Sequence, residues 1–119
     1  MLQGTIDAVG QIHVPIELIT ADGGRSTFAA LLDTGFTGSI GIRGALLPAL
    51  GWQRHGYVAA ALASGTESLP VLIGQVVFDG RPQVVRAIAI TSDDVIIGLS
   101  LLRDKRLLAD FRTGDVTIE

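Results

Sequence analysis

Hydrophobic residues along this chain alternate with polar ones in short runs, and glycine-rich segments separate the runs. Apolar side chains fall at every second position in Ile12–Leu18 and again in Phe28–Leu32. Such alternation is typical of half-buried β-strands, whereas a helix repeats its apolar positions every three or four residues. Pro15 lies in the first run and cannot donate a ladder hydrogen bond, so we expect that strand to lie at an edge or to bend.

The remaining hydrophobic runs extend this pattern through the chain. Further strands are predicted at about Tyr57–Ala63 and Leu69–Phe78, with Ser64–Glu67 as their connection, and at Gln83–Ile90, with a hairpin turn at Asp79-Gly80 before it. A last hairpin is formed by Leu108–Phe111 and Val116–Ile118. Helical spacing occurs in Leu99–Leu107, while Ala45–Gly51 has room for at most a turn or two of helix. No linker or low-complexity segment divides residues 1–119. The sequence therefore predicts a single all-β domain with one short C-terminal helix.

The composition is apolar for so short a chain. Of 119 residues, 48% are hydrophobic and 18% are charged, and the mean hydropathy is +0.49. These values exclude a disordered chain, which needs low hydrophobicity and high net charge. A domain of this size has little interior in which to bury so much apolar surface. We therefore expect a second copy to cover part of the surface, in a homodimer.

Charge and cysteine content remove several classes of function. Nine basic against twelve acidic residues give a net charge of −3, so no basic surface for nucleic acid and no polybasic segment for a membrane is expected. The absence of cysteine excludes disulfides, thiolate metal sites and a cysteine nucleophile. The longest apolar run, Tyr57–Ala63, is too short to cross a bilayer, and the first residues lack the pattern of a signal peptide. A soluble, cytoplasmic protein is the expectation.

One segment is a candidate for chemistry, the tripeptide Asp33-Thr34-Gly35. An apolar run ends at Asp33 and a glycine-rich segment follows, so a buried strand delivers a carboxylate into a turn. A carboxylate there is costly to bury unless it is hydrogen-bonded or shares a proton. Gly35 permits close approach of another backbone, and the Thr34 hydroxyl can lock the turn. The same residue types are common in turns, so an aspartate that only caps a turn is an alternative.

The segment Leu31–Gly38 reads Leu-Leu-Asp-Thr-Gly-Phe-Thr-Gly. It resembles the active-site signature of the retropepsin-like aspartic proteases, most of all the small prokaryotic branch with an Asp-Thr-Gly-Phe motif. Further along, Val95–Gly98 resembles the apolar-apolar-Gly landmark of the same family, and a short helical stretch follows it. The resemblance covers roughly Thr5 to Ile118.

This resemblance implies a closed, small β-barrel that acts as a homodimer, in which each chain contributes one catalytic aspartate, Asp33. Thr34 would hold its symmetry mate across the dimer, and the Gly35 carbonyl would accept a hydrogen bond from the substrate backbone. Such a dimer agrees with the single Asp-Thr-Gly of the chain, because one carboxylate per chain needs a partner chain.

The resemblance also assigns substrate-binding residues. Ser64 and Gly65 would lie at the tip of a flap that closes over an extended peptide or protein substrate, and Ile96 would line an apolar pocket beside the scissile bond. The viral members carry an acidic residue and an arginine that pair next to the two landmarks. Thr37 and Leu99 stand near those places here, so that ion pair is absent.

These observations favour an aspartic endopeptidase that hydrolyses peptide bonds with a water activated by two aspartates, one from each chain. A non-catalytic dimeric module that binds peptides or a partner is the alternative on the same fold. His13 and His55 are isolated in the sequence, so we expect no metal, and the family implies no other cofactor. The substitution Asp33→Asn separates the hypotheses, because a catalytic pair loses activity whereas a turn aspartate loses stability.

Overall fold

The structure is a computed structural model that describes residues 1–119 with the exception of the Leu62 side chain. The strands are β1 (Leu2–Ile6), β2 (Ile12–Ile19), β3 (Arg25–Leu32), β4 (Ile40–Arg43), β5 (Gln53–Leu62), β6 (Gly65–Phe78), β7 (Arg81–Ile90), β8 (Ile96–Ile97), β9 (Leu107–Asp110) and β10 (Asp115–Ile118). The helical segments are α1 (Leu47–Leu50) and the 3₁₀ turns η1 (Gly44–Leu46) and η2 (Leu99–Leu102). The predicted all-β class is confirmed.

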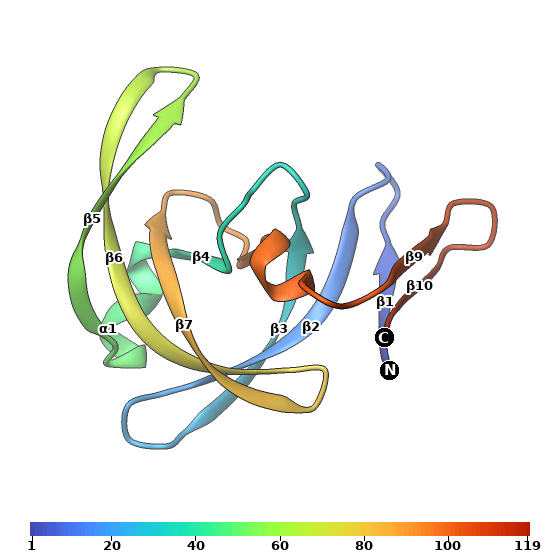
Figure 1. The fold of residues 1–119 in the computed structure, drawn as a ribbon, viewed down its shortest axis with the longest axis horizontal. Coiled ribbons are helices and arrows are strands. Elements are labelled where there is room, and N and C mark those ends of the chain that lie inside the picture. Colours follow the sequence, from blue (N-terminus) through green and yellow to red (C-terminus); the bar gives the residue numbers. More distant parts are fainter.

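The strands form one continuous sheet in the order β5-β6-β7-β4-β8-β3-β2-β1-β10-β9. A further antiparallel pairing joins Glu17–Ile19 of β2 to residues 75–77 of β6 and closes the strands from β6 to β2 into a ring. The β5–β6 hairpin rises from one end of this ring, and β1, β9 and β10 extend it at the other (Figure 1). Most neighbours are antiparallel, but β3 pairs with β8 and β4 with β7 in parallel.

The hydrophobic core fills the ring. Val14, Ile16 and Leu18 of β2 are almost fully buried, which confirms the alternation that the sequence predicts there. Phe78, Ile40, Ile42, Ile97 and Ile118 reach the same core from other strands. Because each of these side chains loses nearly all contact with water, each contributes about 1.5–3 kcal/mol of burial free energy.

Of the two alternatives predicted for the strand with Pro15, an edge or a bend, the edge is wrong, because β2 lies inside the sheet. One side of β2 pairs with β3 over His13–Ile19. The other side pairs first with β1, over Ile12–His13, and then with β6, over Glu17–Ile19. Pro15 lies between these two stretches, at the point where β2 changes partners.

The C-terminal helix is much shorter than the predicted Leu99–Leu107. Only Leu99–Leu102 is helical, as a single 3₁₀ turn. Arg103 then has an extended ψ of 133° and Asp104 a left-handed φ of 62°, so the chain cannot continue the helix. The one α-helix is instead α1 at Leu47–Leu50, within the segment that was expected to hold at most a turn or two. No helix of the described residues is long and apolar enough to cross a membrane.

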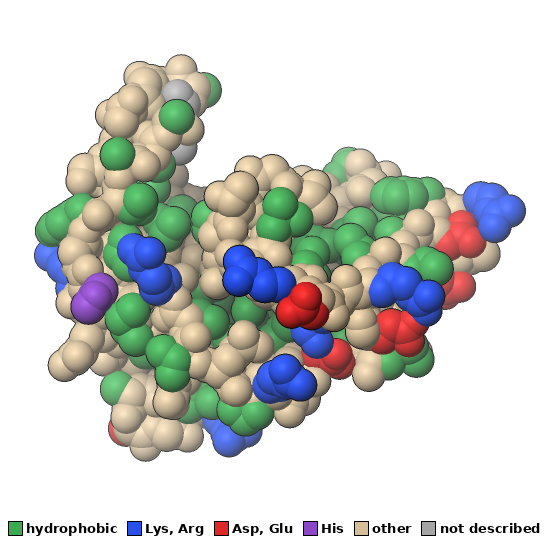
Figure 2. All heavy atoms as spheres, in the orientation of Figure 1, with side chains coloured by type: hydrophobic (Ala, Val, Ile, Leu, Met, Phe, Trp, Pro, Cys, Tyr) green, Lys and Arg blue, Asp and Glu red, His purple; other side chains and the backbone are tan. Residues whose placement is uncertain are grey.

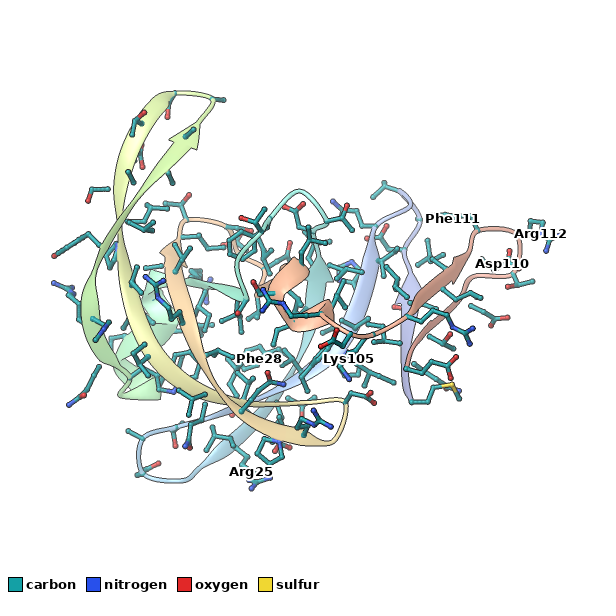
Figure 3. All side chains as sticks on the ribbon, in the orientation of Figure 1. Arg25, Phe28, Lys105, Asp110, Phe111 and Arg112 are labelled. Atoms are coloured by element: carbon teal, nitrogen blue, oxygen red, sulfur yellow. The ribbon has the colours of Figure 1, made fainter. Side chains whose placement is uncertain are left out.

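The hairpins form at the predicted turns, and the two strands of the β5–β6 hairpin are longer than predicted. Asp79 and Gly80 join β6 to β7, and both have positive φ, 52° and 72°, as a two-residue type I′ turn requires. The β5–β6 strands extend to Leu62 and Gly65, so their connection is shorter than the predicted loop from Ser64 to Glu67. The β9–β10 hairpin points away from the ring and carries Phe111 and Arg112 at its tip (Figure 3).

Candidate active site

Asp33 is the first residue after β3, and a parallel neighbour fixes its position. Leu31 and Leu32 of β3 are in register with Ile96 and Ile97 of β8. The Asp33 N–H continues this ladder and donates to the Ile97 carbonyl at 2.9 Å. The apolar runs of β3 and β8, each followed by a segment that contains glycine, therefore lie side by side. Asp33 is exposed at the end of β3.

Hydrogen bonds hold the loop that follows Asp33. The Gly35 N–H donates to Asp33 Oδ1 at 2.9 Å, and the Phe36 N–H donates to the Asp33 carbonyl at 3.1 Å. The Leu99 N–H donates to the Phe36 carbonyl at 2.9 Å, and Ser100 Oγ donates to the Thr37 carbonyl at 2.7 Å. The η2 turn thus ties the loop to the end of β8, and the carboxylate is presented on a braced backbone.

Gly98 explains why this bracing requires glycine at the end of β8. A Cβ atom on Gly98 would lie 2.2 Å from the Gly38 carbonyl oxygen and 2.6 Å from the Phe36 carbonyl oxygen. Both neighbours are backbone atoms of the braced loop, so they cannot turn aside as a flexible side chain can. The loop therefore reaches its position only because residue 98 has no side chain.

An apolar pocket opens beside Asp33. Its volume is about 350 Å³, and its described lining residues are Asp33, Gly35, Phe36, Gly41, Ala60, Ala61, Leu69, Ile88, Ile90 and Ile96. The lining comes from the Asp33 loop, from the β5–β6 hairpin and from β4, β7 and β8. Asp33 is the one charged residue among those described lining residues. Figure 2 shows the hollow on this side of the molecule, between the raised hairpin and the ring.

Comparison with solved structures identifies this arrangement. A retropepsin-like aspartic protease from Rickettsia conorii superposes on the chain with a TM-score of 0.64, over 98% of this chain and 87% of that one, at 15% sequence identity. The chain has the retropepsin-like fold. The protease of simian foamy virus (mac) superposes with a TM-score of 0.52, over 72% of this chain and 88% of that one, at 17% identity. No family model and no curated protein matches the sequence.

Within this retropepsin-like fold, three of the predicted site residues lie around one pocket. Asp33, Gly35 and Ile96 all line the pocket under the hairpin. Thr34 is exposed next to them and lines a different hollow of about 400 Å³, together with residues 10–12, where the β1–β2 connection enters β2. Asp33 also touches that second hollow, so it lies on the boundary between the two.

The predicted flap residues lie apart from the carboxylate. Ser64 and Gly65 are at the tip of the β5–β6 hairpin, which rises above the rest of the molecule in Figure 1. Neither is among the described residues that line the Asp33 pocket. Gly65 has a φ of 124°, a conformation that strongly favours glycine.

Sequence reasoning missed most of the pocket wall. Phe36 was part of the quoted signature but was given no role. Gly41, Ala60, Ala61, Leu69, Ile88 and Ile90 line the pocket without having been singled out. The sequence pattern of β7 holds part of this information, because side chains of a strand point to alternate faces. Ile88 and Ile90 share one face of β7, while Ala87 and Ala89 are buried on the other. Which strand face turns toward Asp33 depends on the long-range pairing of β4 with β7, which a single sequence does not reveal.

The two histidines take no part in this site. His13 lies on β2, and its Nε2 is 2.9 Å from Asp7 Oδ2. His55 is exposed on β5. No group of three or more His, Cys, Asp or Glu residues able to hold a metal ion occurs among the residues that the structure describes.

Proposed function

We propose that this chain is an aspartic endopeptidase that hydrolyses peptide bonds with a water molecule activated by two aspartates, one from each chain of a homodimer. One observation carries the proposal. Asp33 is an exposed carboxylate that is fixed at one oxygen by the Gly35 N–H and that lies at the rim of an apolar pocket. The likeness of the fold to two proteases supports the same function.

The second carboxylate would come from a second copy of the chain. Asp33 is the one acidic residue among the described residues that line the pocket. A twofold axis beside Asp33 would bring the Asp33 of a second copy next to it. Leu99, which bonds the same loop, is 42% exposed, so a dimer formed around this axis would bury an apolar side chain. The exposed Thr34 would meet its symmetry mate there.

The chemistry follows from the repulsion between the two carboxylates. Two such groups held about 3 Å apart cannot both ionise, so the pair keeps one proton. The ionised Asp33 accepts a proton from the water, whose oxygen attacks the peptide carbonyl carbon. The protonated aspartate of the other chain donates a hydrogen bond to the carbonyl oxygen. As the C–N bond breaks, Asp33 gives the leaving nitrogen the proton that it took from the water, and the pair again holds one proton.

The β5–β6 hairpin would cover the substrate. Its inner residues Ala60, Ala61 and Leu69 already form one wall of the pocket. An extended peptide laid between this hairpin and the Asp33 loop could pair with strand backbone, and apolar side chains would enter the pocket. Closure of the tip at Ser64 and Gly65 would exclude water from the reacting groups.

The test is cleavage of a diverse peptide library, read by mass spectrometry between pH 4 and pH 7. Wild type is compared with Asp33→Asn and with wild type inhibited by a statine-type transition-state analogue, and sedimentation checks the dimer. We expect wild type to cleave peptides with apolar residues at the scissile bond, and both controls to be inactive. A verified dimer that binds peptides without cleaving them would instead be the non-catalytic module.

A further inference from the structure

A second pocket lies next to the Asp33 pocket and differs from it in charge. Its volume is about 170 Å³, and its described lining residues are Gly38, Ser39, Val58, Val71, Arg86, Ile88 and Ser100. Ile88 lines both pockets. We call this second space the Arg86 pocket, because Arg86 is the one charged residue among those that line it.

The two pockets follow one another along the same face of β7. Ile90 and Ile88 line the Asp33 pocket, and Ile88 and Arg86 line the Arg86 pocket. These residues alternate with the buried Val85, Ala87 and Ala89, so they share one face of the strand. The neighbouring strand β6 contributes to the two pockets in the same order. Leu69 lines the Asp33 pocket, and Val71, which pairs with Ile88, lines the Arg86 pocket.

Arg86 is free to bind an external anion. It is exposed, and within the described residues it forms neither an ion pair nor a side-chain hydrogen bond. Most other cations of the chain are engaged, as Arg25, Arg43, Lys105, Arg106 and Arg112 pair with carboxylates. Figure 2 shows basic side chains over β5–β7 on the face viewed there.

Hydroxyl groups complete an environment suited to a carboxylate. Ser39 lines the pocket, and its hydroxyl group can donate a hydrogen bond. Ser100 Oγ already donates to the Thr37 carbonyl, which fixes that edge of the pocket. A guanidinium group with a neighbouring hydroxyl donor is the arrangement that binds carboxylates by charge-assisted hydrogen bonds.

We propose that the Arg86 pocket binds an acidic side chain of a peptide whose scissile bond lies at Asp33. This inference rests on the proposed peptidase function and names its substrate class. Arg86 is four residues from Ile90 along β7, or about 13 Å at about 3.3 Å per residue. An extended peptide that runs alongside β7 covers the same distance in about four residues. A twofold dimer has two such pockets, so the acidic residue lies three or four positions to either side of the scissile bond.

The test measures binding with the Asp33→Asn chain, so that hydrolysis does not interfere. The probes are fluorescent ten-residue peptides with two apolar residues at the centre. In each peptide, one of the remaining positions carries Glu, Gln or Lys, and the series moves this residue through all of those positions. Fluorescence anisotropy gives the Kd of each peptide at pH 6.5 and low salt. We expect Glu to bind about tenfold tighter than Gln at the third or fourth position from the centre, and more salt to reduce this preference.

Arginine variants assign that preference to one residue. Arg86→Gln is expected to abolish the Glu preference, and Arg86→Glu to replace it by a preference for Lys. Arg81→Gln is the matched control, because Arg81 is also an exposed arginine of β7 without an ion pair among the described residues, and it lines neither pocket. Thermal unfolding checks that each variant is folded.

The inference is overturned if Glu has no advantage, if Arg86→Gln leaves the advantage unchanged, or if no peptide binds. Cleavage by the wild-type chain is scored separately. Hydrolysis without an acidic preference would leave the peptidase and remove the Arg86 subsite. An Arg86-dependent preference without hydrolysis would leave the subsite on a peptide-binding module.

Discussion

Two aspartates of this chain follow β-strands in the same way and end in different surroundings. Asp7 comes directly after β1 and Asp33 directly after β3. In each, Oδ1 accepts the backbone N–H of the residue two positions later, Val9 at 3.0 Å and Gly35 at 2.9 Å. Both aspartates therefore form the local turn that this residue type favours. Forming such a turn does not distinguish a structural aspartate from a catalytic one.

The remaining contacts of the two aspartates differ. Asp7 Oδ1 also accepts the Gln11 N–H at 2.9 Å, and its Oδ2 is 2.9 Å from Nε2 of His13. The hydrogen bond with the His13 side chain, and then that from the Gln11 backbone, lower the pKa of Asp7. Asp33 has only the Gly35 hydrogen bond to its carboxylate among the described residues, and it opens on an apolar pocket. Both carboxylate oxygens of Asp7 have hydrogen-bond partners within the β1–β2 hairpin, whereas the carboxylate of Asp33 borders the apolar pocket.

The largest effect is expected when the same substitution is made at both positions. Asp33→Asn should lower kcat/KM by about 10³-fold or more, since it removes the general base and the shared proton of the proposed aspartate pair. Its free energy of unfolding should change by less than about 0.5 kcal/mol, because the side chain is exposed and an asparagine oxygen can still accept the Gly35 N–H. Asp7→Asn should show the reverse, with activity retained and a lower urea midpoint. Equal losses of activity would contradict the comparison.

The comparison extends to Gly98. Gly98 follows β8 and Asp33 follows β3, and these two strands are parallel neighbours. One strand end carries an exposed functional group, and the other is packed against the backbone of the Asp33 loop. Gly98→Ala should therefore lower the free energy of unfolding by about 3 kcal/mol, because the added methyl group overlaps two carbonyl oxygens. Urea unfolding with an unchanged m value measures it.

Gly44→Ala is the matched control for that measurement. A Cβ atom on Gly44 would meet no heavy atom within 4 Å, and its backbone needs no positive φ. Its urea midpoint should match that of the wild type. If the two alanine variants unfolded at the same urea concentration, the close approach at Gly98 would not be what holds the loop.

The sequence predicted the residues that carry local signals, and missed those defined by long-range pairing. The alternation in β2 and the Asp79-Gly80 turn are local, and both are confirmed. Of the edge or bend predicted for β2, the edge was wrong, because the pairing of β2 with β6 joins positions far apart in the chain. Helical spacing after Leu99 was also misleading, since the left-handed Asp104 ends that turn early.

The candidate site divides in the same way. Asp33, Gly35 and Ile96 could be located from motifs in the sequence, and all three line one pocket. The opposite wall, from Ala60 to Ile90, has no motif, because small and branched apolar residues occur in every strand of this protein. Its position becomes visible only once β5, β6, β7 and β4 are paired.

A smaller effect is expected at Gly35, which fixes the orientation of the Asp33 carboxylate. An added Cβ would lie 3.1 Å from Asp33 Oδ1, so the carboxylate would have to move by a few tenths of an ångström. Gly35→Ala should lower kcat by about tenfold, because catalytic groups depend on such alignment, with a stability loss below about 1 kcal/mol. Peptide hydrolysis beside urea unfolding checks both. An equal fall in activity for Gly44→Ala would show that the effect is not specific to the carboxylate.

The smallest effect is a pH dependence that belongs to Asp7. Its pKa in the folded chain is lower than the usual 3.8, so its ionised form is favoured by folding. The stability that it contributes is therefore complete above about pH 4 and is lost as the pH falls through the lowered pKa. Urea midpoints of wild type and Asp7→Asn should differ most near pH 6 and converge below pH 4. The lowered pKa values of Asp22, Asp79 and Asp110 are common to both chains and cancel in this difference. A gap that stayed constant down to pH 2.5 would mean that the bond to His13 does not stabilise the fold through the ionised carboxylate.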